Sequence, residues 1–361
     1  MAYTTIDDPS AHFQTALYTG SGSDNAITND GNSDLQPDLL WTKRRNDTGS
    51  TLVFDSSRGF NGDNDSLYME TIGYDAETHN DNDHLKSFNS DGFTMQGASS
   101  RSNRSSDTFV AWQWKMNAGS TTSGGGDDSI ATSTYQANTT AKQSIVTYTG
   151  EASAKTVAHG LGVKPNVIIV KCRQTKDWHV YFDGGQVSDP ETDYLRLNTT
   201  LALTDNDTSW NDTAPTTSVF TIGSGSGGDA NGNTDTFVAY CFANVQGYSK
   251  FGSYEGNGND DGPFVYTGFK PAWLMYKRTN DVANWRILDH KREAFNVMGN
   301  EIYADLNNAA ADDDQIDFLS NGFKLRNGSS VGQNGSGSTY VYMAFAEEPF
   351  VSSEGVPCTA R

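Results

Sequence analysis

The polar residues that could support chemistry in this chain recur at a fixed spacing. A lysine is followed twelve residues later by an aspartate in three places, as Lys43 and Asp55, Lys171 and Asp183, and Lys277 and Asp289. Such residues can form ion pairs between neighbouring strands, or they can line three equivalent binding pockets. Since a buried charge needs a partner, we expect three structural ion pairs, with binding pockets as the alternative.

One loop carries side chains of the type that bind calcium. Oxygen-bearing residues alternate along it, as Asp229, Asn231, Asn233 and Asp235. A calcium loop of the EF-hand type needs glycine at its sixth position and a bidentate glutamate at its twelfth, where this chain has Thr234 and Tyr240. A polar hairpin loop explains the same residues. We therefore expect no metal and no cofactor, with calcium at this loop as the alternative.

Other residues of catalytic type show no usable pattern. The histidines share neither a metal-binding spacing nor a common place in the internal repeat: His12, His79, His84, His159, His179 and His290. Carboxylates are so numerous that no pair can be chosen as an acid–base dyad without geometry. We therefore expect that the chain is not an enzyme and has no catalytic residues.

The lysines and aspartates belong to a sequence unit that occurs three times. Each copy has a Tyr-x-Gly phrase, a proline and a closing phrase, which stand at 18–20, Pro37 and 108–114, at 148–150, Pro165 and 236–242, and at 254–256, Pro271 and 339–345. Each unit is about a hundred residues long, which is an ordinary domain length. Repetition at this scale indicates a structural module built three times.

The apolar segments predict strands. Residues 39–41, 167–172 and 273–276 are continuous apolar runs rich in β-branched and aromatic residues, which is typical of strands covered on both faces. In the closing phrase 236–242, alternate residues would face opposite sides of a sheet. With almost no helical periodicity, we expect an all-β chain of three tandem β-sandwich modules of the jelly-roll type.

The repeat also predicts the domain boundaries. Residues 1–117, 143–247 and 248–361 form the three modules, the last with a short C-terminal tail. Residues 118–142 are rich in Gly, Ser and Thr, so we expect a linker that is flexible or draped over another surface. The second junction, at 243–250, is short, and modules two and three should pack rigidly.

Charge and hydropathy exclude several partners. The 361 residues include 45 acidic and 25 basic side chains, giving a formal net charge of −20. Such a surface repels phosphate backbones and anionic lipids, so we expect neither nucleic acid nor membrane as a partner. The first ten residues lack the features of a signal peptide, and no apolar run has membrane-spanning length, which predicts synthesis in the cytoplasm.

Several phrases resemble a known family. They are FQTALYTG at 13–20, LQPDLLWTK at 35–43, HGLGVKP at 159–165, SKFGSYEGNG at 249–258 and GPFVYTGFKP at 262–271. Together they resemble a repeat family of virion structural proteins of tailed bacteriophages, particularly marine ones, that are tail-fibre-like. The resemblance covers nearly the whole chain and carries over no functional residue. It implies assembly in the host cytoplasm, a place in the virion and other virion proteins as partners.

We therefore expect a bacteriophage virion structural protein of the tail-fibre or receptor-binding apparatus, as a homo-oligomer or in multiple copies. Its target would be a host surface receptor or glycan, bound by long loops because scaffolded loops commonly carry recognition. The candidate binding residues in these loops are Asp183, Asp189, Asp229, Asn231, Asn233, Asp235 and Asn334. The alternatives are a capsid decoration protein, in which three modules imitate a trimer, and a polysaccharide depolymerase.

Overall fold

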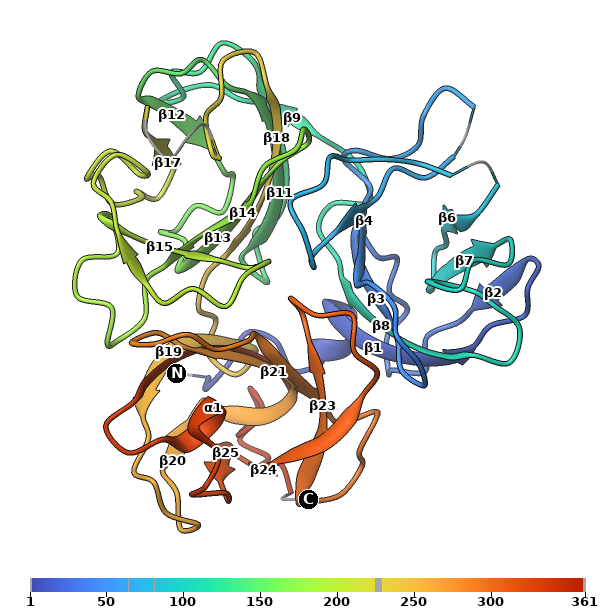
Figure 1. Ribbon diagram of the computed structural model, residues 1–361, viewed down its shortest axis with the longest axis vertical. Coiled ribbons are helices and arrows are strands. Elements are labelled where there is room, and N and C mark those ends of the chain that lie inside the picture. Colours follow the sequence, from blue (N-terminus) through green and yellow to red (C-terminus); the bar gives the residue numbers. More distant parts are fainter. Residues whose placement is uncertain (1, 64, 81, 225–228, 360–361) are drawn as a thin grey trace.

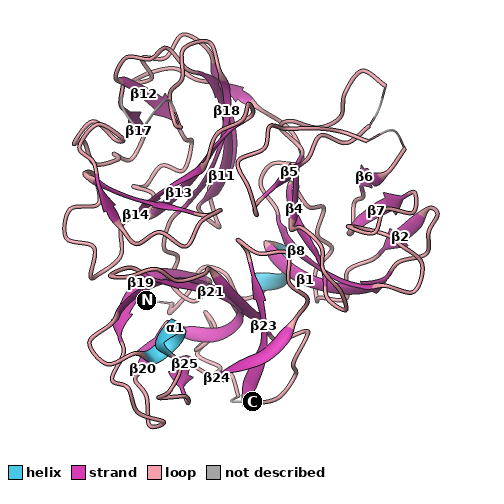
Figure 2. Cartoon of the chain, in the orientation of Figure 1, coloured by secondary structure: helices cyan, strands magenta, loops and turns pink. Residues whose placement is uncertain are grey.

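The structure is a computed structural model that describes residues 2–63, 65–80, 82–224 and 229–359. Antiparallel strands form three lobes around a common centre (Figure 1), and almost no helix is present among the described residues (Figure 2). The lobes coincide with the three copies of the repeat, and we call them modules one, two and three.

The elements follow in chain order. Module one contains η1 (Pro9–Ala11), β1 (Phe13–Thr19), β2 (Asn25–Ile27), β3 (Leu39–Arg44), β4 (Leu52–Asp55), β5 (Met69–Glu70), β6 (His84–Phe88), β7 (Phe93–Gln96) and β8 (Thr108–Trp114). Module two contains β9 (Thr122–Ser123), β10 (Ser133–Asn138), β11 (Gln143–Thr149), β12 (Lys155–Ala158), β13 (Val167–Cys172), β14 (Trp178–Phe182), β15 (Asp193–Arg196), β16 (Thr204–Asp205), β17 (Val219–Ile222) and β18 (Thr236–Phe242). Module three contains β19 (Ser249–Glu255), β20 (Phe264–Tyr266), β21 (Phe269–Arg278), β22 (Arg286–Asp289), β23 (Met298–Tyr303), β24 (Ala311–Leu319), β25 (Gly322–Leu325), α1 (Val331–Asn334) and β26 (Thr339–Pro349).

The modules share one order of five strands in the main sheet, and in module three this sheet continues from β23 into β24, β25 and β20. The main sheet contains the order β1-β8-β3-β4-β5 in module one, β11-β18-β13-β14-β15 in module two and β19-β26-β21-β22-β23 in module three. The strands β2-β7-β6, β12-β17 and β20-β25-β24 lie over the outer faces of these sheets. Apolar side chains fill the space between the two layers, because each sheet must bury its apolar face against another element. The predicted all-β, sandwich-type fold is confirmed.

The closing strands show how each main sheet divides its side chains. In β18, alternate residues from Val238 to Phe242 face the centre of the molecule, whereas those from Phe237 to Cys241 face the core of module two itself. This is the alternation that the sequence predicts for a strand. The main sheets are therefore apolar on both faces, also as predicted.

The largest hydrophobic core is shared by all three modules. The Trp114 ring of module one lies 6.3 Å from Phe242 of module two, and 5.7 Å and 5.6 Å from Trp273 and Phe345 of module three, between ring centroids. Each module has a further core between its two layers. The three tandem sandwiches expected from the sequence are thus not independent, because each closes one core alone and shares the other. A sheet with two apolar faces cannot cover both within one sandwich, and the three inner faces cover one another.

Residues 118–142 do not form the expected flexible linker. They contain β9 and β10, and β10 pairs with β11 along its whole length. Gln136 donates from Nε2 to the hydroxyls of Ser56 (2.8 Å) and Ser57 (2.7 Å) in module one. Alternating polar side chains suit a strand at the edge of a sheet, where one face meets solvent. The segment therefore extends the sheet of module two and joins it to module one.

The N-terminal segment closes the ring by packing on module three. The Tyr3 hydroxyl donates to the carbonyl oxygen of Gly268 (2.8 Å), and the backbone N–H of Ser353 donates to Asp7 Oδ1 (2.6 Å). Ile6 enters the shared core. Both ends of the described chain consequently lie at module three (Figure 1).

Candidate functional site

The three repeated lysines join neighbouring modules. Their Nζ atoms donate across the contacts between modules, which we call seams: from Lys43 to the carbonyl oxygen of Leu306 in module three (2.5 Å), from Lys171 to that of Tyr74 in module one (3.5 Å), and from Lys277 to that of Thr200 in module two (3.2 Å). Each lysine is fully buried. The modules are thus connected in a cycle by equivalent hydrogen bonds.

The predicted ion pairs of Lys43 with Asp55, Lys171 with Asp183 and Lys277 with Asp289 do not form. The strand register gives the reason, since Asp55 lies opposite Leu39, four residues before Lys43 on the same strand. Four residues of a strand span about 13 Å. Lys43 and Asp55 therefore lie at opposite ends of the β3–β4 pair. Both residues have structural partners, but not each other.

Burial changes the ionisation of these lysines. It lowers the pKa of Lys43 to about 7 and the pKa values of Lys171 and Lys277 to about 8. The charge of Asp305 opposes this effect at Lys43 and Lys277, while burial raises the pKa of Asp305 itself to about 7. Because all three ammonium groups are enclosed and hydrogen bonded, their arrangement supports joining of modules rather than acid–base chemistry.

Two of the three repeated aspartates form buried networks across seams. Asp55 pairs with Arg58 (2.5 Å to Nε) and accepts from the Tyr240 hydroxyl of module two (2.7 Å); Asp289 pairs with Arg292 (2.6 Å to Nε) and accepts from Trp112 Nε1 of module one (3.0 Å). Although burial opposes ionisation, the Arg292 guanidinium holds the pKa of Asp289 below its usual value. Each network fixes one module to the next.

The third aspartate, Asp183, has a different environment. It is partly exposed and pairs with Lys164 (2.8 Å), which is itself exposed. The residue of module three that corresponds to Tyr240 and Trp112 is Met343, which cannot donate a hydrogen bond. The third seam therefore lacks a buried charge network at this position.

The candidate binding residues do not come together in one site. Asp229, Asn231 and Asn334 are buried, Asp183 and Asp235 are partly exposed, and Asp189 and Asn233 are exposed; Asn334 lies in module three and the others lie in module two. The buried members have structural partners. Asp229 pairs with Arg196 (3.0 Å), and Asn231 Oδ1 accepts from the N–H of Glu151 (2.9 Å). Two of the four residues considered for calcium, Asp229 and Asn231, thus bind other residues of the protein.

The outer loops are anchored in the same way in each module. The hydroxyls of the Tyr-x-Gly tyrosines donate to backbone carbonyls, from Tyr18 to Ser102 (2.8 Å), from Tyr148 to Ala230 (2.6 Å) and from Tyr254 to Gln333 (2.9 Å). The glycine of the phrase is required by close packing, because a Cβ atom on Gly150 would lie 2.2 Å from the carbonyl oxygen of Gly232. The three modules therefore anchor their outer loops with the same residues, the tyrosine and glycine of the Tyr-x-Gly phrase, which we call the frame.

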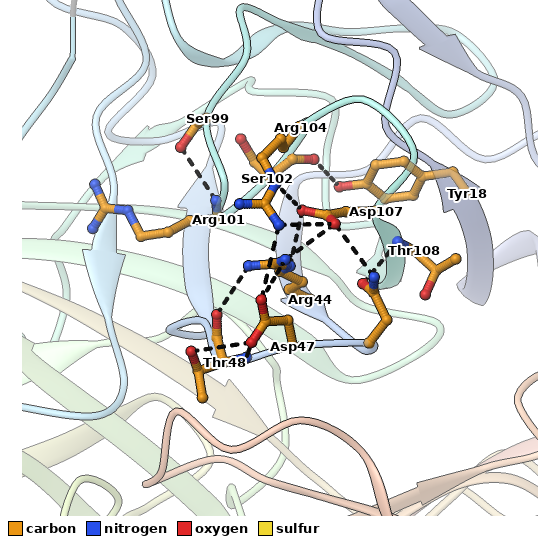
Figure 3. Close-up of polar contacts among 11 residues, drawn as sticks. Tyr18, Arg44, Asp47, Thr48, Ser99, Arg101, Ser102, Arg104, Asp107 and Thr108 are labelled. Atoms are coloured by element: carbon orange, nitrogen blue, oxygen red, sulfur yellow. Dashed lines mark hydrogen bonds and ion pairs between the residues drawn. The ribbon is translucent and has the colours of Figure 1, made fainter.

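Figure 3 shows the outer loop of module one, where two arginines meet at Asp107; module three keeps the equivalent of one pair, Arg278 with Asp281 (3.3 Å). Arg44 and Arg104 both bind Asp107, at 2.9 and 2.7 Å from Oδ2, and Arg44 also binds Asp47 (2.8 Å). Arg44 and Asp107 are buried, so the network holds the loop rigidly. Cys172 and Asp235 occupy the equivalent places in module two.

The described residues contain no group of three or more His, Cys, Asp or Glu side chains placed to hold a metal ion. Among the same residues, no helix is long and apolar enough to cross a bilayer.

A cleft of about 230 Å³ opens at the seam between modules one and three. Its walls come from the N-terminal segment, β1 and the loop between β2 and β3 on one side, and from residues in or next to β21, β22 and β26 on the other. The lining residues are Asp8, Ser10, Phe13, Gln14, Thr15, Asp30, Gly31, Asn32, Ala272, His290, Lys291, Ala346, Glu347 and Glu348. Lys291 pairs with Asp30 (2.7 Å) and connects the two sides. None of these residues is among those singled out from sequence as binding residues.

Sequence reasoning missed two sets of residues for which a signal was present. Asp-x-x-Arg occurs in modules one and three, as Asp55 with Arg58 and Asp289 with Arg292. The cleft residue Thr15 stands three residues before the tyrosine of its Tyr-x-Gly phrase, where the other modules have apolar residues. Alignment of the three copies would have shown both features.

These observations define an all-β protein of three equivalent modules with near-threefold symmetry around a shared core. The chain belongs to the family DUF7483, a domain of unknown function, whose model matches residues 8–349. A single match across all three modules agrees with a core that none of them closes alone. No curated protein matches the chain.

Proposed function

We propose that this chain is a non-enzymatic structural protein of a bacteriophage particle, exposed on its surface in the tail-fibre or receptor-binding apparatus. The observation that supports this function is the division of each module into a repeated frame and a variable outer end. The rings of the frame stack at 5.1 Å for Tyr18 on Phe109, 5.0 Å for Tyr148 on Phe237 and 4.8 Å for Tyr254 on Tyr340. A rigid scaffold that carries unlike loops is the usual architecture of recognition proteins.

The outer ends differ in chemistry although their anchoring is alike. Module one has the charged network of Arg44, Arg104 and Asp107, module two has the Asp229–Arg196 pair, and module three has the short helix α1. The repeated charged groups of the frame are engaged in structural bonds, which favours a role without catalysis. We infer partners among other virion proteins, several copies per particle, and a host receptor or glycan as the target.

A second candidate, a capsid decoration protein, is favoured by the near-threefold arrangement of the modules (Figure 1). One chain with this shape can match a threefold position of a shell and present similar contacts to three neighbours. The body of described residues is also compact rather than elongated.

Gold-labelled antibody against the chain, applied to purified particles, tests both proposals. We expect label at the tail and inhibition of phage adsorption by the purified protein. Label over heads without such inhibition would instead support decoration, and particles without label would contradict both. Host envelope polysaccharide incubated with the protein should yield no new reducing ends, since their sustained release would indicate a depolymerase.

A further inference from the structure

The outer layer of each module contains an equivalent short strand, which is β2, β12 or β20. Each of these strands stands at the end of its sheet order. Each pairs one branched apolar residue with the phenylalanine whose ring lies edge-on to the tyrosine of the frame: Ile27 with Phe93, Val157 with Phe220 and Val265 with Phe323. The residues on either side of the apolar one are therefore equivalent in the three modules.

In module two, the chain itself covers the outer edge of this strand. The N–H groups of Ser129 (3.1 Å) and Ile130 (3.2 Å) donate to the carbonyl oxygen of Thr156, and Ser129 Oγ accepts from the N–H of Thr156 (2.8 Å). The Ile130 side chain is buried in the core of this module. The covering residues belong to segment 118–142, whereas the junction before module three, at 243–250, is too short to supply such a segment.

In module three, the same edge is open. The N–H of Thr267 donates to the carbonyl oxygen of Asn321 beside β25 (3.0 Å), and the bonds of an antiparallel pair recur at every second residue. The N–H and C=O groups of Phe264 and Tyr266 therefore point away from β25, and no hydrogen bond to them is present among the described residues. Unpaired edge groups of this kind can pair with another strand.

The side chains at this edge also distinguish module three. The two positions that flank the apolar residue have small side chains in modules one and two but aromatic rings in module three: Ala26 and Thr28, Thr156 and Ala158, and Phe264 and Tyr266. The two rings lie on one face of β20, and they are 46% and 51% exposed. The other modules form the same strand without such rings, so folding does not require them. Exposed rings on a strand offer apolar surface to the side chains of a neighbouring strand.

We propose that β20 binds an extended segment of a partner polypeptide, which forms backbone hydrogen bonds with Phe264 and Tyr266 and packs apolar side chains on their rings. Addition of a strand to a sheet edge is a common mode of peptide recognition, and residues 127–130 provide an example within this molecule. The net charge of −20 disfavours a second copy as the occupant and favours a neutral or basic segment.

This proposal goes beyond the proposed function and does not depend on it, because peptide binding by the purified chain is measured without a particle. Failure to bind peptide would leave the location on the particle untouched, and the reverse also holds.

The experiment is a titration of the full chain with a synthetic peptide, Lys-Thr-Ile-Thr-Ile-Thr-Lys, blocked at both ends. We expect saturable binding with a Kd below about 1 mM, as suits a small interface, and slower hydrogen exchange at the amides of Phe264 and Tyr266. The same peptide with all internal amides N-methylated lacks backbone donors and should not bind. With glutamate in place of both lysines, binding should weaken about tenfold.

Variants of the strand locate the site. Tyr266→Pro removes an outward N–H and keeps the bonds to β25, because an edge strand tolerates proline where its N–H faces away from the sheet, and we expect it to abolish binding. Phe264→Thr combined with Tyr266→Ala gives β20 the residues of β12 and should weaken binding about tenfold. Thr28→Pro, at the equivalent exposed position of module one, is the matched control and should bind the peptide like the parent.

Several outcomes would overturn the proposal. They are no saturation of the parent at about 1 mM peptide, equal binding of the N-methylated or the glutamate peptide, and parent-like binding by both β20 variants. Equal loss of binding in Thr28→Pro would also overturn it. Circular dichroism checks the folding of each variant, and if Tyr266→Pro does not fold, the double variant decides. A dimer of the parent that Tyr266→Pro dissociates in sedimentation would assign the edge to a second copy and contradict the partner segment.

Discussion

The three seams differ in how they accommodate the repeated aspartate. At the seams of module one with modules two and three, a buried aspartate binds an arginine three residues later and accepts a hydrogen bond from the neighbouring module. At the seam between modules two and three, Asp183 is partly exposed, Gln186 replaces the arginine and Met343 replaces the donor. Instead, Gly184 packs closely against the backbone of Gly252.

The comparison indicates what a buried charge requires in this fold. A carboxylate removed from water is tolerated when both a counter-ion and further hydrogen bonds are supplied. Here the arginine counter-ion comes from the same module as the aspartate, and a further hydrogen-bond donor comes from the neighbouring module. Where the next module offers the sulfur of Met343, the aspartate lies at the surface and binds Lys164. The charge networks are therefore properties of the assembled ring, and not of a single module.

The largest expected effect is the loss of the arginine at a filled seam. Arg292→Ala leaves the carboxylate of Asp289 buried without its counter-ion, and we expect the free energy of unfolding to fall by about 3–5 kcal/mol. The control is Lys164→Ala at the third seam, where an exposed pair should contribute at most about 1 kcal/mol. Urea denaturation of both variants measures the difference. Equal losses would show that the two kinds of seam are energetically alike.

Removal of the donor from the neighbouring module should have a smaller effect. Tyr240→Phe keeps the ring in the shared core but removes the hydroxyl that donates to Asp55, which still has Arg58. Hydrogen bonds to charged groups contribute about 1.5–3 kcal/mol, and we expect a loss in that range by urea denaturation. Met343→Leu at the third seam conserves volume and should cost less than about 1.5 kcal/mol. A neutral Tyr240→Phe would contradict the importance of the donor.

The buried lysines predict a pH dependence that is common to all three seams. Folding lowers their pKa values to about 7 and about 8, whereas the unfolded chain binds these protons until about pH 10.4. Between pH 7.5 and 8.5 the unfolded state thus holds more protons, so stability should rise with pH. Lys171→Met should reduce this slope by up to about 1.4 kcal/mol per pH unit. Urea denaturation at several pH values tests this, and an unchanged slope would contradict it.

Much of this fold could be predicted from the sequence. Strand positions, the alternation in 236–242 and the common layout of the modules follow from apolar runs and repeated phrases, because these depend on local geometry. The Asp91-Gly92 pair predicts the hairpin between Phe88 and Phe93, where Gly92 has a positive φ. The Asn321-Gly322 pair also predicts a hairpin, which forms, but Ser320 and Asn321 make its turn and Gly322 already belongs to β25. The sequence repeat shows that the modules have a common layout, but it does not show whether they lie apart or pack around one centre.

The shared core and the cleft could not be predicted, because both depend on how modules meet. Lys43 and Asp55 have a spacing that suits an ion pair, but strand register separates them. Lys43 donates to Leu306 of module three, and Asp55 accepts from Tyr240 of module two. The segment 118–142 has the composition of a linker, yet the edge of the β11 strand gives it hydrogen-bond partners. In such cases the tertiary context decides between structures that are locally similar.

The smallest predicted effect tests whether the arginine of the same module or the donor of the neighbouring module is needed to bury the aspartate. Gln186→Arg gives module two the Asp-x-x-Arg sequence of the other two modules at an exposed position. Because Met343 still offers no donor and Asp183 stays accessible to water, the new pair should behave as a surface pair and change stability by no more than about 0.5 kcal/mol. Urea denaturation beside the parent measures it. A gain above about 1.5 kcal/mol, the range of hydrogen bonds to buried charges, would mean that the arginine alone builds the network and that the neighbouring module has no part in it.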